Sequence, residues 1–135
     1  APLVTAGASG RRRVLLLDDE PNIRESLGEY LEDCGIATLL AESGEEALAM
    51  DGLGEVAVAV VDIRLGGMDG LEFIKVLHAR RPGILFLIHT GSTDFQLDPE
   101  LRAMGLTERE VFFKPVLDMS VLEQAIRQKL GETES

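Results

Sequence analysis

The chain has 135 residues and a formal net charge of -11 at pH 7, from 13 basic and 24 acidic side chains. This length suits one domain, and so acidic a chain repels the phosphate backbone of nucleic acid, so we expect no direct nucleic-acid binding. The single cysteine, Cys34, excludes an internal disulfide framework. No apolar run approaches the roughly 20 residues of a membrane span, so we expect a cytoplasmic protein without membrane contact.

The ends of the chain differ in composition from its middle. Residues 1–12 are interpreted as a flexible leader, residues 13–130 as one domain, and residues 131–135 as a tail or the start of a linker to a further domain. The basic run Arg11–Arg13 is interpreted as a solvated flank of the leader.

Five short apolar runs alternate with helical patterns, which is typical of a parallel sheet covered on both faces by helices. The central runs are apolar without alternation, so both faces of those strands should be buried. The runs are Val14–Leu17, Ala37–Ala41, Val56–Val61, Ile84–Ile88 and Val111–Phe113. The sequence therefore predicts a single (βα)5 unit.

The helices are indicated by apolar residues at three- and four-residue steps and by capping residues. Asn22 is predicted to cap the first helix, which ends before Gly35. Ser43 with Glu46, and Ser120 with Glu123, are predicted capping boxes of two later helices. A third helix follows the turn at residues 66–67 and stops before Pro82, and a short fourth helix starts at residues 98–99 and runs to about residue 104.

Polar side chains follow four of the five predicted strands. Asp18 and Asp19 come after the first strand, Asp62 after the third, Thr90 after the fourth and Lys114 after the fifth. Because right-handed crossovers place the carboxyl ends of parallel strands at one edge of the sheet, we expect these side chains to meet there.

Three carboxylates at one site repel each other unless a cation is bound among them. Mg²⁺ is the expected ion, because it prefers hard oxygen ligands and is held by one or two carboxylates with waters and phosphoryl oxygens. Asp62 can then act as a nucleophile that forms an aspartyl-phosphate, while the metal and Lys114 neutralise the transferring group and Thr90 offers its hydroxyl to a phosphoryl oxygen.

Together these motifs closely resemble the response-regulator receiver domains of two-component signalling. The resemblance covers about residues 13–130 and rests on the ordered set Asp18-Asp19-Glu20, Asp62 to Gly70, Thr90-Gly91 and Lys114-Pro115. It implies a flavodoxin-like three-layer sandwich with a five-stranded parallel sheet in the order 2-1-3-4-5. It also implies Asp62 as the phosphoacceptor, Asp19 as a direct metal ligand, Asp18 as a ligand through water and the Arg64 backbone carbonyl as a further ligand. Thr90 looks like the switch hydroxyl and Lys114 like the counter-charge of the phosphate.

The resemblance further implies a phosphorylation-dependent switch rather than an enzyme. Such a switch assists only its own phosphorylation and dephosphorylation. Its partners would be a sensor histidine kinase or phosphotransfer protein and a downstream effector protein or domain, and a homodimer is possible. One alternative is a receiver-like interaction module that works without phosphorylation. Another is a phosphatase or mutase with an aspartate nucleophile, but such enzymes generally carry a second acid where this chain has Arg64.

Two features depart from the family pattern. Receivers usually carry an aromatic residue three positions before the lysine, and Val111 stands there. Strand alternation sends the neighbouring Phe112 and Phe113 to opposite faces, so neither automatically replaces it. The stretch around residues 107–110 is also about two residues longer than in the family pattern, which points to an unusual output surface.

Overall fold

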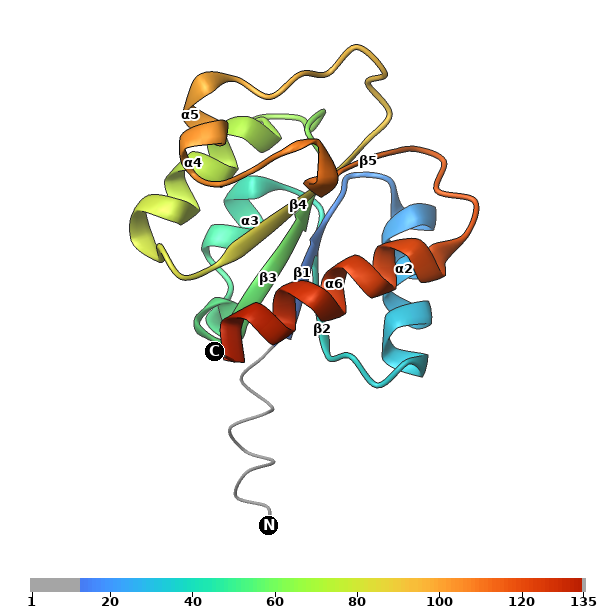
Figure 1. Ribbon diagram of the computed structural model, residues 1–135. Helices are drawn as coiled ribbons and strands as arrows, with labels where there is room; N and C mark the ends of the chain where they lie inside the picture. The colour runs from blue at the N-terminus through green and yellow to red at the C-terminus, as the bar shows by residue number, and fades with distance from the viewer. Residues whose placement is uncertain (1–12, 135) are drawn as a thin grey trace.

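The computed structural model describes residues 13–134 (Figure 1). The expected leader, with Arg11 and Arg12, lies outside the described residues. The strands are β1 (Arg13–Leu17), β2 (Thr38–Ala41), β3 (Val56–Val61), β4 (Leu85–Thr90) and β5 (Val111–Phe113). Each coincides with a predicted apolar run to within two residues at either end.

The five strands form one parallel sheet in the order β2-β1-β3-β4-β5, which confirms the predicted flavodoxin-like topology. β3 lies at the centre, and five of its six residues are buried. β4 is buried from its second residue to its last, as its continuous apolar pattern predicts. All strands point the same way, so their carboxyl ends share one edge.

Helices cover both faces of the sheet, so the molecule has three layers (Figure 1). On one face lie α2 (Pro21–Asp33) and α6 (Met119–Glu134). On the other lie α3 (Gly44–Leu48), α4 (Gly70–Arg80) and α5 (Pro99–Ala103). Two 3-10 turns, η1 (Asp51–Glu55) and η2 (Glu108–Glu110), precede β3 and β5.

Each face has its own hydrophobic core. Under α2 and α6, the fully buried Leu31 and Ile126 pack against Val58 of β3. Under the other three helices, Phe73 of α4 is the largest fully buried side chain. Burial of this kind is the main stabilising contribution to the fold.

The predicted helix starts divide into two groups. Ser43 accepts a hydrogen bond from the Glu46 amide and Asp98 from the Leu101 amide, so these two side-chain caps are confirmed. The capping box predicted for Ser43 and Glu46 is incomplete, because the Glu46 carboxylate accepts a bond from the Glu42 amide instead of the Ser43 amide. The Asn22 cap is wrong, because the helix already begins at Pro21, where the fixed φ of proline suits the first helical position.

The start of α6 is also corrected. The predicted capping residue Ser120 lies inside the helix, and the Asp118 carboxylate accepts bonds from the Ser120 amide and hydroxyl. Glu123, the expected partner in that capping box, instead pairs with Arg127 one turn along the helix. At the other end, α6 continues as far as Glu134, where the sequence predicted a tail. No helix among residues 13–134 is long and apolar enough to cross a membrane.

The extra residues before β5 form a defined structure. Thr107 and Glu110 make a complete capping box around η2. Glu110 is buried, and its carboxylate forms an ion pair with the Lys129 ammonium of α6, with 2.9 Å between Oε2 and Nζ. Burial alone would raise the pKa of Glu110, but the bonds from Lys129 and Thr107 outweigh it and lower that pKa. This insertion therefore ties the start of β5 to α6.

Candidate functional site

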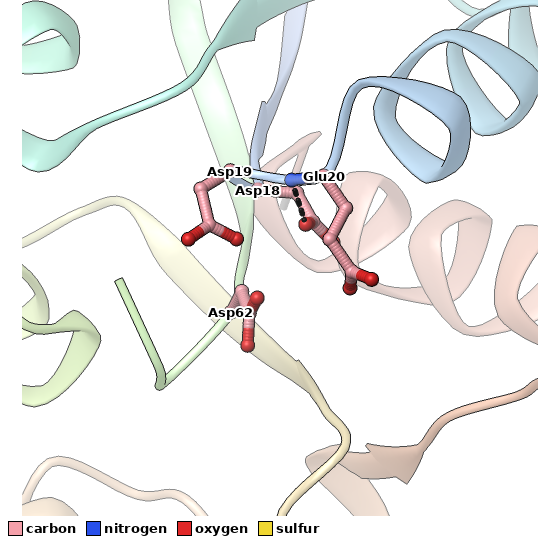
Figure 2. A group of neighbouring side chains, drawn as sticks. All are labelled: Asp18, Asp19, Glu20 and Asp62. Carbon is pink, nitrogen blue, oxygen red and sulfur yellow. Dashed lines mark hydrogen bonds between the residues drawn. The ribbon is translucent and has the colours of Figure 1, made fainter. Parts of the chain in front are cut away.

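Four carboxylates meet at the carboxyl edge of the sheet (Figure 2). Asp18, Asp19 and Glu20 follow β1, and Asp62 follows β3. One oxygen from each side chain lies within 4.8 Å of the others. Asp18 and Asp62 are buried, whereas Asp19 and Glu20 are exposed, so the cluster opens to solvent on one side.

The backbone holds these acids in place. The Asp18 amide bonds to the Ala41 carbonyl of β2, and the Asp62 amide bonds to the Leu17 carbonyl of β1. The backbone amides of Asp18 and Asp62 therefore continue the hydrogen bonding of β1 and β3 to their neighbouring strands. The chain after Asp62 is held equally closely, because a Cβ on Gly70 would lie 2.2 Å from the Asp62 carbonyl oxygen. Only glycine fits this contact.

Lys114 completes the site from the end of β5. Its ammonium lies 2.8 Å from Asp18, 2.7 Å from Glu20 and 3.1 Å from Asp62. Its amide donates to the Thr90 carbonyl at 2.8 Å, which joins the ends of β4 and β5. The following peptide bond, to Pro115, is cis. The contacts with Glu20 and Asp62 are hydrogen bonds, and the contact with Asp18 is an ion pair.

The charges shift the ionisation of both central groups. Burial raises the pKa of Asp62, and the neighbouring Asp18 adds to this rise, while Lys114 opposes it without cancelling it. Burial alone would lower the pKa of Lys114, but its bonds to Asp18 and Glu20 raise that pKa overall. At neutral pH the lysine is therefore a fixed cation beside a carboxylate that resists being charged.

The loops after β3 and β4 are linked above the acids. Thr90 is fully buried, and its hydroxyl accepts a hydrogen bond from the Ser92 amide. The Ser92 hydroxyl in turn accepts a bond from the Arg64 guanidinium at 2.7 Å. The Arg64 amide donates to the Asp62 carboxylate at 3.2 Å. Arg64 thus contacts the predicted phosphoacceptor through its backbone and the Thr90 loop through its side chain.

The structure brings together most of the predicted site and adds one residue. Asp18, Asp19, Asp62 and Lys114 converge as predicted, and Thr90 is joined to Lys114 through its backbone. Glu20 belongs to the cluster as well, although the sequence showed it only as part of the acidic motif. Its side chain reaches the site because it directly precedes Pro21, the first residue of α2. The position of Glu20 immediately before Pro21 was the sequence signal that could have predicted its place in the cluster.

The residues fit a magnesium ion. The donor set consists of carboxylate oxygens, with no histidine or cysteine among them, and this is the ligand chemistry of Mg²⁺ rather than of zinc or copper. Burial is the main cause of the raised pKa of Asp62, and the neighbouring Asp18 carboxylate adds to it, so a divalent cation beside both acids would stabilise their ionised forms.

Comparison with known proteins identifies the family. The model of the response regulator receiver domain matches residues 14–127. The chain belongs to this family. Its members act as phosphorylation-dependent signalling switches of two-component systems, and they bind Mg²⁺ at an acidic pocket. The sequence-based prediction of fold and functional class is therefore confirmed.

The similar proteins include a transcriptional regulator and an enzyme. The transcriptional regulatory protein FixJ of Bradyrhizobium diazoefficiens is 34% identical over 119 residues, which cover 85% of this chain and 57% of that protein. A cyclic di-GMP phosphodiesterase of Thermotoga maritima is 29% identical over 117 residues, which cover 87% of this chain and 30% of that protein. The chain thus spans less than two thirds of the length of these relatives.

Solved receiver structures resemble the fold closely. The response regulator TrrA of Thermotoga maritima, in complex with Mg²⁺-BeF, has a TM-score of 0.74 and 27% identity, covering 87% of this chain and 98% of that one. A receiver domain of Clostridium thermocellum has a TM-score of 0.77 and 26% identity, covering 91% of this chain and 97% of that one.

Proposed function

We propose that Asp62 accepts a phosphoryl group from a phosphohistidine of a sensor histidine kinase or phosphotransfer protein. The observation that carries this proposal is the convergence of Lys114 from β5 on the acids that follow β1 and β3. A buried carboxylate with a fixed cation on one side and further acids on the other is arranged to receive a dianionic group together with a divalent ion.

The metal would be held by residues of the acidic cluster. We assign Asp19 and Asp62 as direct ligands, Asp18 as a ligand through water, and the Arg64 backbone carbonyl as a further ligand. When bound, Mg²⁺ supplies positive charge that offsets the charge on the phosphoryl oxygens and on the acids around them. Glu20 adds a fourth carboxylate at the open side of the site.

In the transfer step, an oxygen of Asp62 forms a bond to phosphorus as the bond from phosphorus to the donor nitrogen breaks. The electron pair of that bond returns to the donor imidazole, so no outside reactant is needed. Lys114 exchanges carboxylate partners for a phosphoryl oxygen, and the Thr90 hydroxyl donates to another. The phosphoryl group carries about 1.5 to 2 negative charges, which replace the single charge of the Asp62 carboxylate, and it adds three strong acceptor oxygens. This change biases the loops after β3 and β4 between two arrangements.

The consequence for signalling follows from the position of these loops. The loop after β3 leads into α4 and the loop after β4 leads into α5, so a change at Asp62 alters the surface that these helices present to an effector protein or domain. The domain works as a switch and assists only its own phosphorylation and dephosphorylation. The interaction module without phosphorylation is not favoured, because family membership and the convergence of the acids with Lys114 both point to phosphorylation.

Small-molecule phosphorylation tests the proposal directly. Incubation with Mg²⁺ and acetyl phosphate should add one phosphoryl group by intact-mass spectrometry, and Asp62→Asn should abolish this addition. Asp33→Asn, which changes an exposed aspartate at the end of α2, should be labelled like the wild type. Equal labelling of Asp62→Asn, or labelling that persists after chelation of the metal, would contradict the assignment.

A further inference from the structure

A cavity of about 280 Å³ lies beside the site, on the α2 and α6 face of the sheet. It is bounded by the start of α2, by the loop from β5 to α6 and by the start of α6. Ile23 and Leu27 form one wall, and Met119 and Leu122 form the other. Lys114 also lines the cavity, so a group that enters it comes close to Asp62.

His89 of β4 lies in this largely apolar lining. It is only 6% exposed, and its Nε2 atom finds no hydrogen-bond partner among residues 13–134. Burial lowers the pKa of His89, and the nearby Lys114 lowers it further, so the imidazole is neutral at pH 7. A buried polar nitrogen without a partner is unfavourable, because it has lost its bonds to water and gained none in return. A ligand with a hydrogen-bonding group would remove this penalty.

The surroundings restrict the charge of such a ligand. The Lys114 ammonium is already in contact with Asp18, Glu20 and Asp62, and these three carboxylates offset its positive charge. The same three carboxylates repel an anionic group. A cation would have to leave water for apolar walls, which is costly. The cavity therefore suits an uncharged group with an apolar body and a single polar tip.

The same face carries apolar side chains that point to a protein partner. Leu117, next to the cavity residue Val116, is 92% exposed, and Val121 in the first turns of α6 is 49% exposed. Exposed apolar side chains in the segments that border a cavity enlarge the apolar surface that a partner protein can cover. A phosphohistidine donor must also bring a protein surface close to Asp62, and this cavity adjoins Lys114.

We propose that the cavity receives a tyrosine-like side chain of the phosphodonor protein, and that the His89 imidazole hydrogen-bonds to its hydroxyl. Tyrosine combines an aromatic body with a polar tip that is usually hydrogen-bonded when buried. His89 thereby acts as a specificity residue that distinguishes a donor with this side chain from a donor with a purely apolar one. This inference rests on the proposed transfer from phosphohistidine.

Two amino-acid derivatives that differ by one hydroxyl test the inference. N-acetyl-tyrosinamide and N-acetyl-phenylalaninamide are titrated into the ¹⁵N- and methyl-labelled wild-type chain. We expect saturable NMR shifts at Ile23, Leu27, Met119 and Leu122, with binding of the tyrosine derivative roughly threefold to tenfold tighter, which is the effect of one hydrogen bond. His89→Leu should abolish this difference, and an otherwise unchanged amide spectrum shows that the variant is folded.

Each other outcome overturns a defined part of the inference. Equal affinity of the wild type for both derivatives would exclude the role of His89. Shifts with para-cresol but with neither derivative would show that the cavity binds a free small molecule and not a side chain attached to a peptide backbone. No shifts at the four cavity residues would exclude the site. These results are independent of the acetyl phosphate test, because that small donor labels Asp62 without filling the cavity.

Discussion

The ammonium of Lys114 lies 3.1 Å from the carboxylate of Asp62, although 52 positions separate the two residues along the chain. The contact exists because β3 and β5 end at the same edge of a parallel sheet, with only β4 between them. One residue thus does two things: it offsets the charge of the resting acids, and it is placed to contact the group that Asp62 is proposed to accept.

Replacing Lys114 should separate these two roles. In Lys114→Met the acids lose their cation, so Mg²⁺ should bind about tenfold tighter, as expected when a positive charge is removed within a few ångströms. Labelling by acetyl phosphate should nevertheless slow by about 100-fold, the usual cost of losing one donor to a developing charge. Isothermal titration and timed mass spectrometry measure the two effects. Lys75→Met, in a partly exposed ion pair with Asp98, is the matched control and should change neither.

The pKa of Asp62 predicts how magnesium and pH interact. Because this pKa is raised above 3.8 in the folded state, protonated Asp62 stabilises the metal-free fold at low pH, and that contribution is lost as pH rises through the folded-state pKa. Mg²⁺ binds the ionised form, so it should raise the Tm clearly at pH 7 and very little at pH 4. In Asp62→Asn the magnesium effect at pH 7 should shrink. A wild-type Tm increase of the same size at both pH values would refute the coupling.

Because Gly70 lies so close to the Asp62 carbonyl, adding a single methyl group at residue 70 should reduce both stability and magnesium binding. Gly70→Ala should lower the free energy of unfolding by about 2 kcal/mol or more and weaken magnesium binding, because the backbone around Asp62 must shift. Gly83→Ala is the control, since a Cβ there meets no atom within 4 Å. Urea unfolding and magnesium titration of both variants provide the comparison, and equal stability of the two would contradict the packing argument.

The insertion before β5 should contribute to stability through Glu110. Removal of its buried carboxylate in Glu110→Ala should cost about 2 kcal/mol, the range for hydrogen bonds to charged groups. The pKa of Glu110 is lowered in the folded state, so this stabilisation is present near neutral pH and disappears as pH falls through that pKa. Glu108→Ala removes an exposed ion pair with Arg102 and should lower the free energy of unfolding much less, because water and salt screen such a pair. Urea unfolding at pH 7 and pH 4 distinguishes the two.

The convergence of the site residues could be predicted from the sequence, whereas the helix caps and the cavity beside them were harder or impossible to predict. Asp18, Asp62 and Lys114 each follow an apolar run, and the topology of a parallel sheet then determines that they meet. Local capping was less certain at α6, because Asp118 and Ser120 can both serve as caps and only the backbone decides between them. The cavity beside His89 could not be predicted, because its shape depends on how α2, α6 and the intervening loop pack against each other.

Alternation along β5 behaved as predicted, with consequences for the output surface. Phe112 packs into the core under α2 and α6, whereas Phe113 is 42% exposed on the opposite face. Phe113 is paired with Thr90 in the strand register and lines a surface groove together with Phe95 and Val111. The aromatic residue that is paired with Thr90 in the strand register therefore stands one position before the lysine instead of three.

The sheet order also distributes stiffness unequally around the site. The acids extend from β1 and β3, each of which is hydrogen-bonded to strands on both sides, while Lys114 extends from a marginal strand of three residues with a single neighbour. Elements with fewer backbone bonds open at lower energetic cost. The carboxylates that follow β1 and β3 are consequently held in place more rigidly than Lys114. When the group bound at the site changes, we expect Lys114 and the end of β5 to move and the carboxylates to stay.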